Sequence, residues 1–211
     1  MSFRNRRKGD TLARVTDQSL TPSSARATAN TYHFITQWRV KASLEEINLV
    51  LGNATDLARW WPSVYLEVKE LDPGDARGIG RVIDLYTKGW LPYTLRWQFK
   101  VTESRYPRGF TLVATGDFVG RGIWTFDPDG ESVKITYDWK IEAEKPLLKY
   151  LSFIMKPIFS ANHHWAMRMG ERSLILELAR RHAATDAERA GVPPPPPTTF
   201  AWLLPRRGKP S

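Results

Sequence analysis

Two neighbouring side chains in the last third of the chain, Asn162 and His163, are the first candidates for chemistry. An imidazole can accept or donate a proton near neutral pH, and an amide can hold a polar ligand atom through hydrogen bonds. Tyr93 and Tyr137 add phenol hydroxyls from two strand-like stretches. Together these groups could orient a ligand in an apolar cavity, or His163 could form an acid/base pair with either tyrosine for enolisation or dehydration. Each group could equally be satisfied inside an ordinary core, and the sequence leaves that alternative open.

Other kinds of site find little support. The chain has no cysteine and four histidines, and adjacent His163 and His164 would point about 100° apart on a helix, so they cannot readily share a metal. No phosphate-binding loop, dinucleotide fingerprint or serine nucleophile motif occurs, and the short glycine pairs at 78–80 and 120–122 are interpreted as turns or bulges. Asp117 is interpreted as a residue of a bend or of the outer sheet face. We therefore expect no metal and no cofactor.

A helix predicted over residues 157–181 positions Asn162 and His163. At about 100° per residue, one broad face of this helix mixes polar and apolar residues: Phe159, Asn162, His163, Ala166, Met167, Gly170, Ser173, Leu174 and Leu178. A helix that only covers a core would use more leucine and isoleucine. Gly170 costs about 1 kcal/mol relative to alanine in a helix interior. It therefore indicates either a strand packed closely on the helix or an open space beside it.

The sequence before this helix predicts a strand, then two short helices, then a meander of antiparallel strands. Residues 32–40 alternate between apolar and polar, which is typical of a half-buried strand. Ser43 and Glu46 form a capping box that starts a short helix, and a second short helix is predicted over 55–60. From residue 64 to residue 144 we expect antiparallel strands that need one apolar face covered. The long helix is the only element large enough to cover it.

The inner face of this predicted sheet is unusually aromatic. It carries Trp38, Tyr93, Trp97, Phe99, Tyr137 and Trp139. Between the stretches 110–119 and 123–126, Gly120 and Gly122 predict a bulge or a sharp bend.

Both ends of the chain lack a core-forming pattern. Residues 1–30 are polar with a net charge of +4, and we expect them to be disordered. Residues 184–211 carry +2 and contain five consecutive prolines, Pro193–Pro197. The apolar and basic tip at 198–207 could dock on the domain, make a weak contact with a protein or membrane surface, or do neither. Removing residues 1–28 and 186–211 is expected to change stability little.

Charge and hydropathy limit the partners. Of the total net charge of +9, only +3 belongs to residues 31–183, so the domain has no charge pattern typical of nucleic-acid binding. No apolar run reaches the roughly 18 residues of a membrane span, and no secretory signal is evident. We expect a soluble cytoplasmic protein with no nucleic-acid partner and no integral membrane segment.

Four stretches carry a family resemblance, at residues 38–43, 60–62, 116–124 and 162–171. In this order they resemble the START-like helix-grip superfamily (SRPBCC), in particular its bacterial polyketide cyclase/dehydrase-type branch. The resemblance implies an α+β helix-grip fold over residues 31–183. In this fold a curved antiparallel β-sheet wraps around a long C-terminal helix, and two short helices follow the first strand. It also implies a ligand cavity between the sheet and the long helix.

We therefore expect a module that binds a small hydrophobic or aromatic molecule, lipid-like or polyketide-like, in that cavity. The expected ligand-binding residues are Trp38, Trp61, Tyr93, Trp97, Tyr137, Trp139, Asn162, His163 and Met167. The alternative is a cyclase/dehydratase-type enzyme that uses His163 with Tyr93 or Tyr137 as acid and base. A third class is an interaction protein whose tail, residues 193–207, recruits a partner. The sequence does not identify a catalytic residue.

Overall fold

The computed structural model describes residues 31–143 and 152–201. The predicted N-terminal tail at 1–30 and residues 202–207 of the C-terminal tip lie outside the described residues. The elements are β1 (Thr31–Val40), α1 (Leu44–Gly52), η1 (Ala54–Asp56), α2 (Leu57–Trp60), β2 (Tyr65–Asp72), β3 (Val82–Lys88), β4 (Thr94–Ser104), β5 (Gly109–Gly116), β6 (Phe118–Asp129), β7 (Ser132–Ala143), α4 (Ser152–His182) and α5 (Asp186–Gly191).

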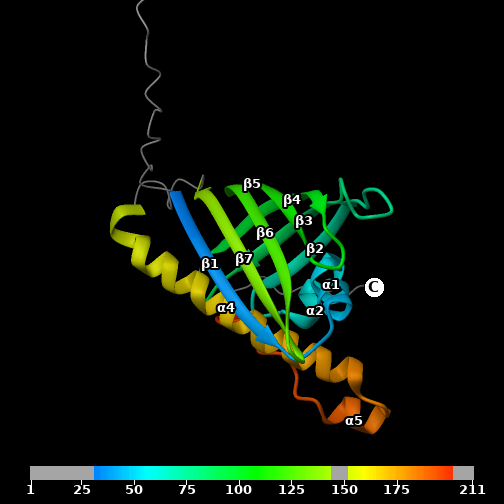
Figure 1. The fold of residues 1–211 in the computed structure, drawn as a ribbon. Helices are drawn as coiled ribbons and strands as arrows, with labels where there is room; N and C mark the ends of the chain where they lie inside the picture. Colours follow the sequence, from blue (N-terminus) through cyan, green and yellow to red (C-terminus); the bar gives the residue numbers. More distant parts are fainter. Residues whose placement is uncertain (1–30, 144–151, 202–211) are drawn as a thin grey trace, which may run out of the picture.

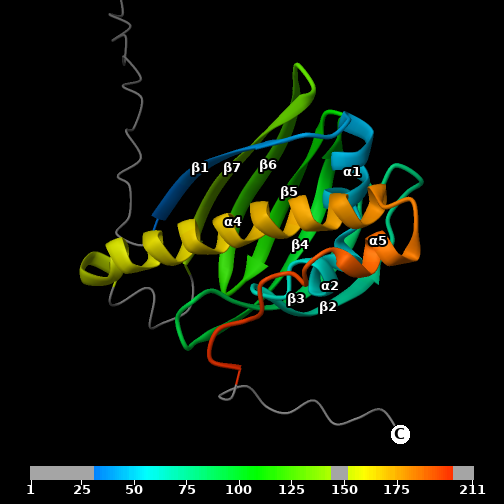
Figure 2. The ribbon, with the colours of Figure 1, turned by 90° about the horizontal axis from the view of Figure 1, so that it is seen from below.

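The seven strands form one antiparallel sheet in the order β1-β7-β6-β5-β4-β3-β2. The sheet is curved, and α4 crosses its concave face, as Figures 1 and 2 show from two directions. The two short helices α1 and α2 follow β1 and lie at one end of the sheet. The predicted fold class is therefore confirmed, including the long helix as the cover of the apolar face.

Local sequence explains most of these elements. The Ser43 side chain accepts a hydrogen bond from the backbone N–H of Glu46, whose carboxylate accepts one from the N–H of Ser43, so the predicted capping box starts α1. Alternation sets the buried face of each strand, because successive side chains point to opposite faces. Every second residue of β7 from Val133 to Ile141 is buried, including Ile135 and the predicted Tyr137 and Trp139.

The prediction of a bulge or bend at Gly120 and Gly122 is wrong. The chain turns earlier, between β5 and β6, where Gly116 has a φ of +111°, and β6 runs through both glycines in unbroken register with β7. A Cβ on Gly120 would lie 2.2 Å from the carbonyl oxygen of Lys140, and one on Gly122 would lie 2.8 Å from the hydroxyl oxygen of Tyr137. These glycines therefore serve the close approach of β7 and its large side chains to β6.

The long helix begins earlier than predicted. It spans Ser152–His182, with Pro157 inside it rather than at its start. A proline removes one backbone hydrogen bond, to the carbonyl four residues earlier, and its ring crowds that carbonyl. In a helix of 31 residues one lost bond does not end the element.

Gly170 is closely packed, so the interpretation of an open space beside it is wrong. Its neighbour is an indole instead of a strand: a Cβ on Gly170 would lie 2.2 Å from Cζ2 of Trp61 and 2.6 Å from its Cε2. The ring of Trp61 therefore lies directly against the backbone of α4. Beyond this contact the helix buries Leu174 and Leu178 almost completely.

The chain after α4 packs back on the domain as far as it is described. Thr185 and Glu188 form a capping box that starts α5. The segment after α5, orange to red in Figure 2, then returns toward the β3 side of the sheet. There the hydroxyl oxygen of Thr199 lies 3.2 Å from the carbonyl oxygen of Trp90 and 2.9 Å from the ammonium of Lys88. Residues 198–201 of the tip thus lie against the domain, and partner contact stays a prediction for residues 202–207.

Candidate ligand-binding cavity

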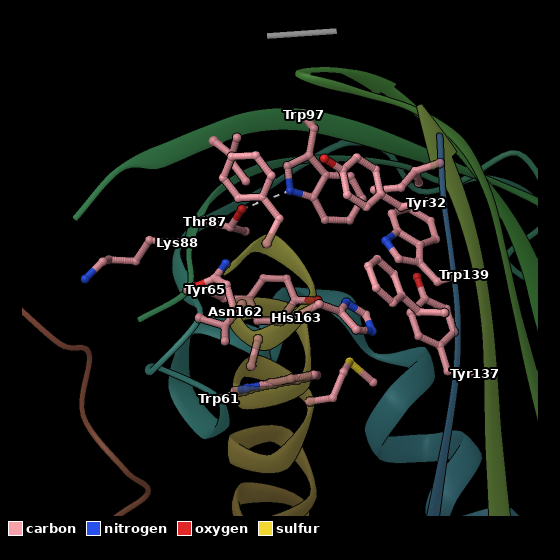
Figure 3. A pocket seen from close by; sticks show the side chains of 18 of the residues that line it. Tyr32, Trp61, Tyr65, Thr87, Lys88, Trp97, Tyr137, Trp139, Asn162 and His163 are labelled. Atoms are coloured by element: carbon pink, nitrogen blue, oxygen red, sulfur yellow. Dashed lines mark hydrogen bonds between the residues drawn. The ribbon is translucent and has the colours of Figure 1, made fainter. Parts of the chain in front are cut away.

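A cavity of about 140 Å³ lies between the first half of α4 and the sheet. Figure 3 shows it enclosed by aromatic side chains from several elements. The residues that line it are Tyr32, Phe34, Trp61, Val64, Tyr65, Thr87, Lys88, Gly89, Tyr93, Leu95, Trp97, Tyr137, Trp139, Ile141, Phe159, Asn162, His163, Ala166 and Met167. Every site residue predicted from the sequence is among them except Trp38. That indole is buried behind the cavity, with its ring centroid 5.8 Å from that of Trp61 and 5.6 Å from that of Trp124.

Stacked rings form one wall. The ring of Tyr137 lies 4.0 Å from Trp124 at an interplanar angle of 15°, and 5.5 Å from Trp139 at 19°. On β4, the Nε1 of Trp97 donates a hydrogen bond of 3.0 Å to the hydroxyl of Thr87. That bond satisfies the buried indole N–H and fixes the ring. The aromatic surface is therefore rigid and offers flat faces to a ligand.

His163 lies at the β1 side of the cavity. Its ring stacks on Phe34 at 4.0 Å and 14°, and its Nε2 lies 3.5 Å from the hydroxyl of Thr36, the limit of a hydrogen bond. Burial, and secondly the neighbouring His164, lower the pKa of His163 to about 4. The imidazole is therefore neutral at neutral pH. Among the described residues no hydrogen bond joins His163 to Tyr93 or Tyr137, so the predicted acid/base pair is not assembled in this structure.

Asn162 holds the loop between β3 and β4. Its Oδ1 accepts a hydrogen bond of 3.2 Å from the backbone N–H of Leu91. A Cβ on Gly89 would lie 2.1 Å from the same oxygen, so the close approach of this amide requires glycine at position 89. Asn162 thus borders the cavity and also anchors a segment of its wall.

Comparison with known proteins identifies the architecture. No family profile matches the sequence, and no curated protein is significantly similar to it. Among solved structures, a protein from Thermus thermophilus is similar with a TM-score of 0.56 and 15% identity, over 69% of this chain and 99% of its own. The Zhui aromatase/cyclase from a Streptomyces species gives 0.55 and 18%, over 73% and 97%. Norcoclaurine synthase from Thalictrum flavum, a point mutant in complex with a transition-state analogue, gives 0.50 and 18%, over 70% and 96%.

The protein has the helix-grip fold. The resemblance expected from the sequence is confirmed at this level. With identities this low, the similarity establishes the fold and leaves the activity to be argued from the site.

The polar groups of this helix-grip cavity are mainly tyrosine hydroxyls. Tyr65, Tyr93 and Tyr137 come from β2, the segment before β4, and β7. Burial raises the pKa of Tyr65, burial and then Tyr32 raise the pKa of Tyr93 to about 12, and burial and then Tyr65 raise that of Tyr137. All three are protonated at neutral pH. Within the described parts of the chain, none of the three hydroxyls has a hydrogen-bond partner.

Sequence reasoning missed Tyr65, Thr87 and Lys88. Tyr65 is the first residue of β2, and in the sequence it alternates with the apolar Val64 and Leu66, which predicts the opposite face for it. The register shift between Tyr65 and Glu67 is a feature of the folded sheet that this alternation does not show. The spacing of four from Trp61 to Tyr65 is the one available signal, and the two rings do meet edge to face at 5.2 Å. Thr87 shares the inward parity of Leu85, a pattern that the sequence does contain.

Lys88 is the one charged side chain among the described residues that line the cavity. Its ammonium donates to the backbone carbonyl and the hydroxyl of Thr199, and it lies 5.4 Å from the ring of Phe200. Figure 3 shows the side chain directed away from the aromatic residues. Burial lowers the pKa of this ammonium group. Among the described residues, no charged group thus points into the interior of the cavity.

The described chain shows neither a metal-binding cluster nor a membrane-spanning helix. In the ranges 31–143 and 152–201, no three histidine, aspartate or glutamate side chains are grouped as a metal site would need. No helix in those ranges has the length and hydropathy to cross a membrane.

Proposed function

We propose that this helix-grip protein binds a small hydrophobic or aromatic molecule in the cavity between the sheet and the first half of α4. The observation that carries the proposal is an aromatic cavity in which the hydroxyls of Tyr65, Tyr93 and Tyr137 have no hydrogen-bond partner among the described residues. Buried polar groups are nearly always hydrogen-bonded in native proteins, by protein atoms, by water or by a ligand. A cavity of about 140 Å³ is close in size to the engineered apolar cavity of about 150 Å³ that binds benzene.

The energetics favour such a ligand. Removing apolar surface from water contributes about 25 cal/mol per Å², so a ring compound that buries roughly 200 Å² would gain about 5 kcal/mol before the costs of association. The rings around the cavity are already fixed by their mutual stacking, so little side-chain entropy is lost on binding.

A variant that fills the cavity tests this proposal. Ala166 lines the cavity, whereas Ala161 on the same helix is exposed. We expect Ala166→Phe to weaken the binding of naphthalene at least tenfold in calorimetric titration, and Ala161→Phe to leave it unchanged. Equal binding by both variants would place the ligand elsewhere. Native mass spectrometry of the purified full chain should also detect any apolar molecule that co-purifies.

A second candidate is a cyclase/dehydratase-type enzyme, favoured by a neutral imidazole, His163, in the same cavity as the Tyr93 and Tyr137 hydroxyls. With its pKa near 4, His163 would be a weak base and would need a ligand to connect it to a tyrosine. Loss of water from a β-hydroxy ketone, followed by absorbance, tests this activity. A rate that His163→Gln leaves unchanged would remove His163 from the reaction.

A further inference from the structure

Resting on the proposed function, we infer that the cavity selects small neutral ring compounds that carry a hydrogen-bonding oxygen, such as phenols and aryl ketones, over carboxylates of the same shape. The fold and the aromatic walls alone would admit any small hydrophobic compound, whereas these preferences define a narrower ligand class. Three independent features of the cavity lead to it: its charge, its hydroxyl groups and its size.

The first feature is the absence of a charge that could pair with an anion. Lys88, the single cation among the described lining residues, extends away from the rings and is held by Thr199. Its position in β3 explains this direction, since the preceding Thr87 has the inward parity and its hydroxyl accepts a hydrogen bond from Trp97. His163 is uncharged and stacks on Phe34. A carboxylate placed among these side chains would lose its hydration and gain no countercharge, which is strongly unfavourable.

The second feature is the set of hydroxyl groups. Tyr65, Tyr93 and Tyr137 reach the cavity from three different elements, and within the described residues no protein atom accepts or donates a hydrogen bond at these hydroxyls. Each can donate to a ligand oxygen and also accept from a ligand hydroxyl. A site with such groups favours a ligand that pairs with them over an analogue that leaves them unpaired. Phenols and aryl ketones meet this requirement without adding charge.

The third feature is size. A volume of about 140 Å³ suits one ring or two fused rings. The flat walls of Trp97, Tyr137 and Trp139 favour a planar compound, because stacked or edge-to-face ring pairs add to the gain from burial.

Four probes of one ring system test the selection on the full-length protein: β-naphthol, β-naphthamide, β-naphthoate and naphthalene. Calorimetric titration at neutral pH should show β-naphthamide binding at least tenfold more tightly than β-naphthoate, which has nearly the same shape and a negative charge. β-Naphthol should bind about threefold to tenfold more tightly than naphthalene. If β-naphthoate binds as well as β-naphthamide, the inference is overturned while the proposed function stands. If none of the four probes binds, the proposed function itself fails.

Tyrosine-to-phenylalanine variants test the role of the hydroxyls while keeping every ring. The triple variant Tyr65→Phe, Tyr93→Phe, Tyr137→Phe should bind β-naphthol no more tightly than naphthalene, with naphthalene affinity unchanged. Tyr106→Phe is the matched control, because Tyr106 is 67% exposed and lies in a turn outside the cavity. An unchanged preference for β-naphthol in the triple variant would contradict the inference. If the triple variant does not fold, the three single variants replace it, and each should lower that preference.

Discussion

The two halves of α4 cover the same sheet but meet it in different ways. From Phe159 to Met167 the helix borders a cavity and presents Asn162 and His163 to it. From Gly170 to Leu178 it is tightly packed, with Trp61 against its backbone and Leu174 fully buried. Trp61 belongs to both regions, because it lines the cavity and packs on Gly170. The indole therefore separates the space that can hold a ligand from the part of the core that holds the fold together.

The packed half also contains a buried carboxylate that is paired with two arginines. Glu177 is almost completely buried, and its two carboxylate oxygens accept hydrogen bonds of 2.7 and 2.9 Å from Arg59 of α2 and one of 2.8 Å from Arg181. The cavity half has no comparable ion pair among its described residues. Stability and binding are thus expected to depend on different halves of one helix, and substitutions in each half can test this.

The largest effect is expected from Gly170→Leu. A side chain there must displace the indole of Trp61, because even a Cβ would lie 2.2 Å from it. Overpacking typically costs about 1–3 kcal/mol, and we expect the upper end of that range or more. Denaturant unfolding measures the change. Gly191→Leu is the control, since no atom lies within 4 Å of the corresponding Cβ position. Equal stability of the two variants would contradict the packed character of this half.

The next largest effect is expected from Glu177→Gln. Burial alone would raise the pKa of Glu177, but hydrogen bonds from Arg59 and Arg181 lower it overall. A depressed carboxyl pKa contributes stability that is present above the unfolded value of 4.5 and is lost as the pH falls below it. Because Arg59 is 52% exposed, we expect a loss of only about 1–3 kcal/mol at neutral pH.

Denaturant unfolding of Glu177→Gln between neutral pH and pH about 3 tests both points, and the loss relative to the unmodified protein should shrink at the acidic end. Glu45→Gln, on the exposed face of α1, should change little. A constant difference across this range would show that the charge of Glu177 is not what stabilises the fold.

His163 is expected to produce a smaller, pH-dependent effect in the cavity half. Its pKa is lowered from 6.5 to about 4, so the unfolded chain binds a proton in this range that the folded protein does not. Stability should therefore fall as the pH drops from 6.5 to about 4, by about 1–2 kcal/mol after allowance for partial solvent access.

His163→Gln should remove this part of the pH dependence and keep most of the stability at neutral pH. His163→Ala separates a structural role from a binding role. Thermal melts that fall equally with and without ligand, together with unchanged affinity, would assign His163 to the fold alone.

The smallest effect is expected from the C-terminal segment. Thr199→Ala removes the hydroxyl that contacts Lys88 and the carbonyl of Trp90, and we expect a loss of about 1 kcal/mol. Thr198→Ala is the control, since the Thr198 hydroxyl contacts only the carbonyl of Thr199 among the described residues, at 3.4 Å.

The contacts of Thr199 also lead us to expect that truncation before residue 192 lowers the melting temperature measurably. An unchanged melting temperature would support the original expectation that the tail matters little.

Much of the fold could be predicted because strand and helix periodicity are local properties. The alternation in β4 and β7 correctly gave the buried faces, and the Ser43–Glu46 pair correctly gave the start of α1. Most of the cavity lining followed from the same parity, since a side chain that points inward on either the sheet or the helix must meet the space between them. Local patterns were thus sufficient for the order of elements and for many of the inward residues, although Tyr65 and Thr87 were missed.

Only the tertiary structure decided which inward residues border open space and which are packed. Trp38 and Trp97 both point inward, yet Trp38 lies against Trp61 and Trp124 whereas Trp97 lines the cavity. The sequence did not predict which side chains pack against Gly170 and Gly122. These side chains, Trp61 and Tyr137 respectively, are distant in sequence from the glycines. Periodicity fixes the direction of a side chain. The distance to the next surface depends on how elements from distant parts of the chain pack together, and in this protein that distance separates a binding cavity from a solid core.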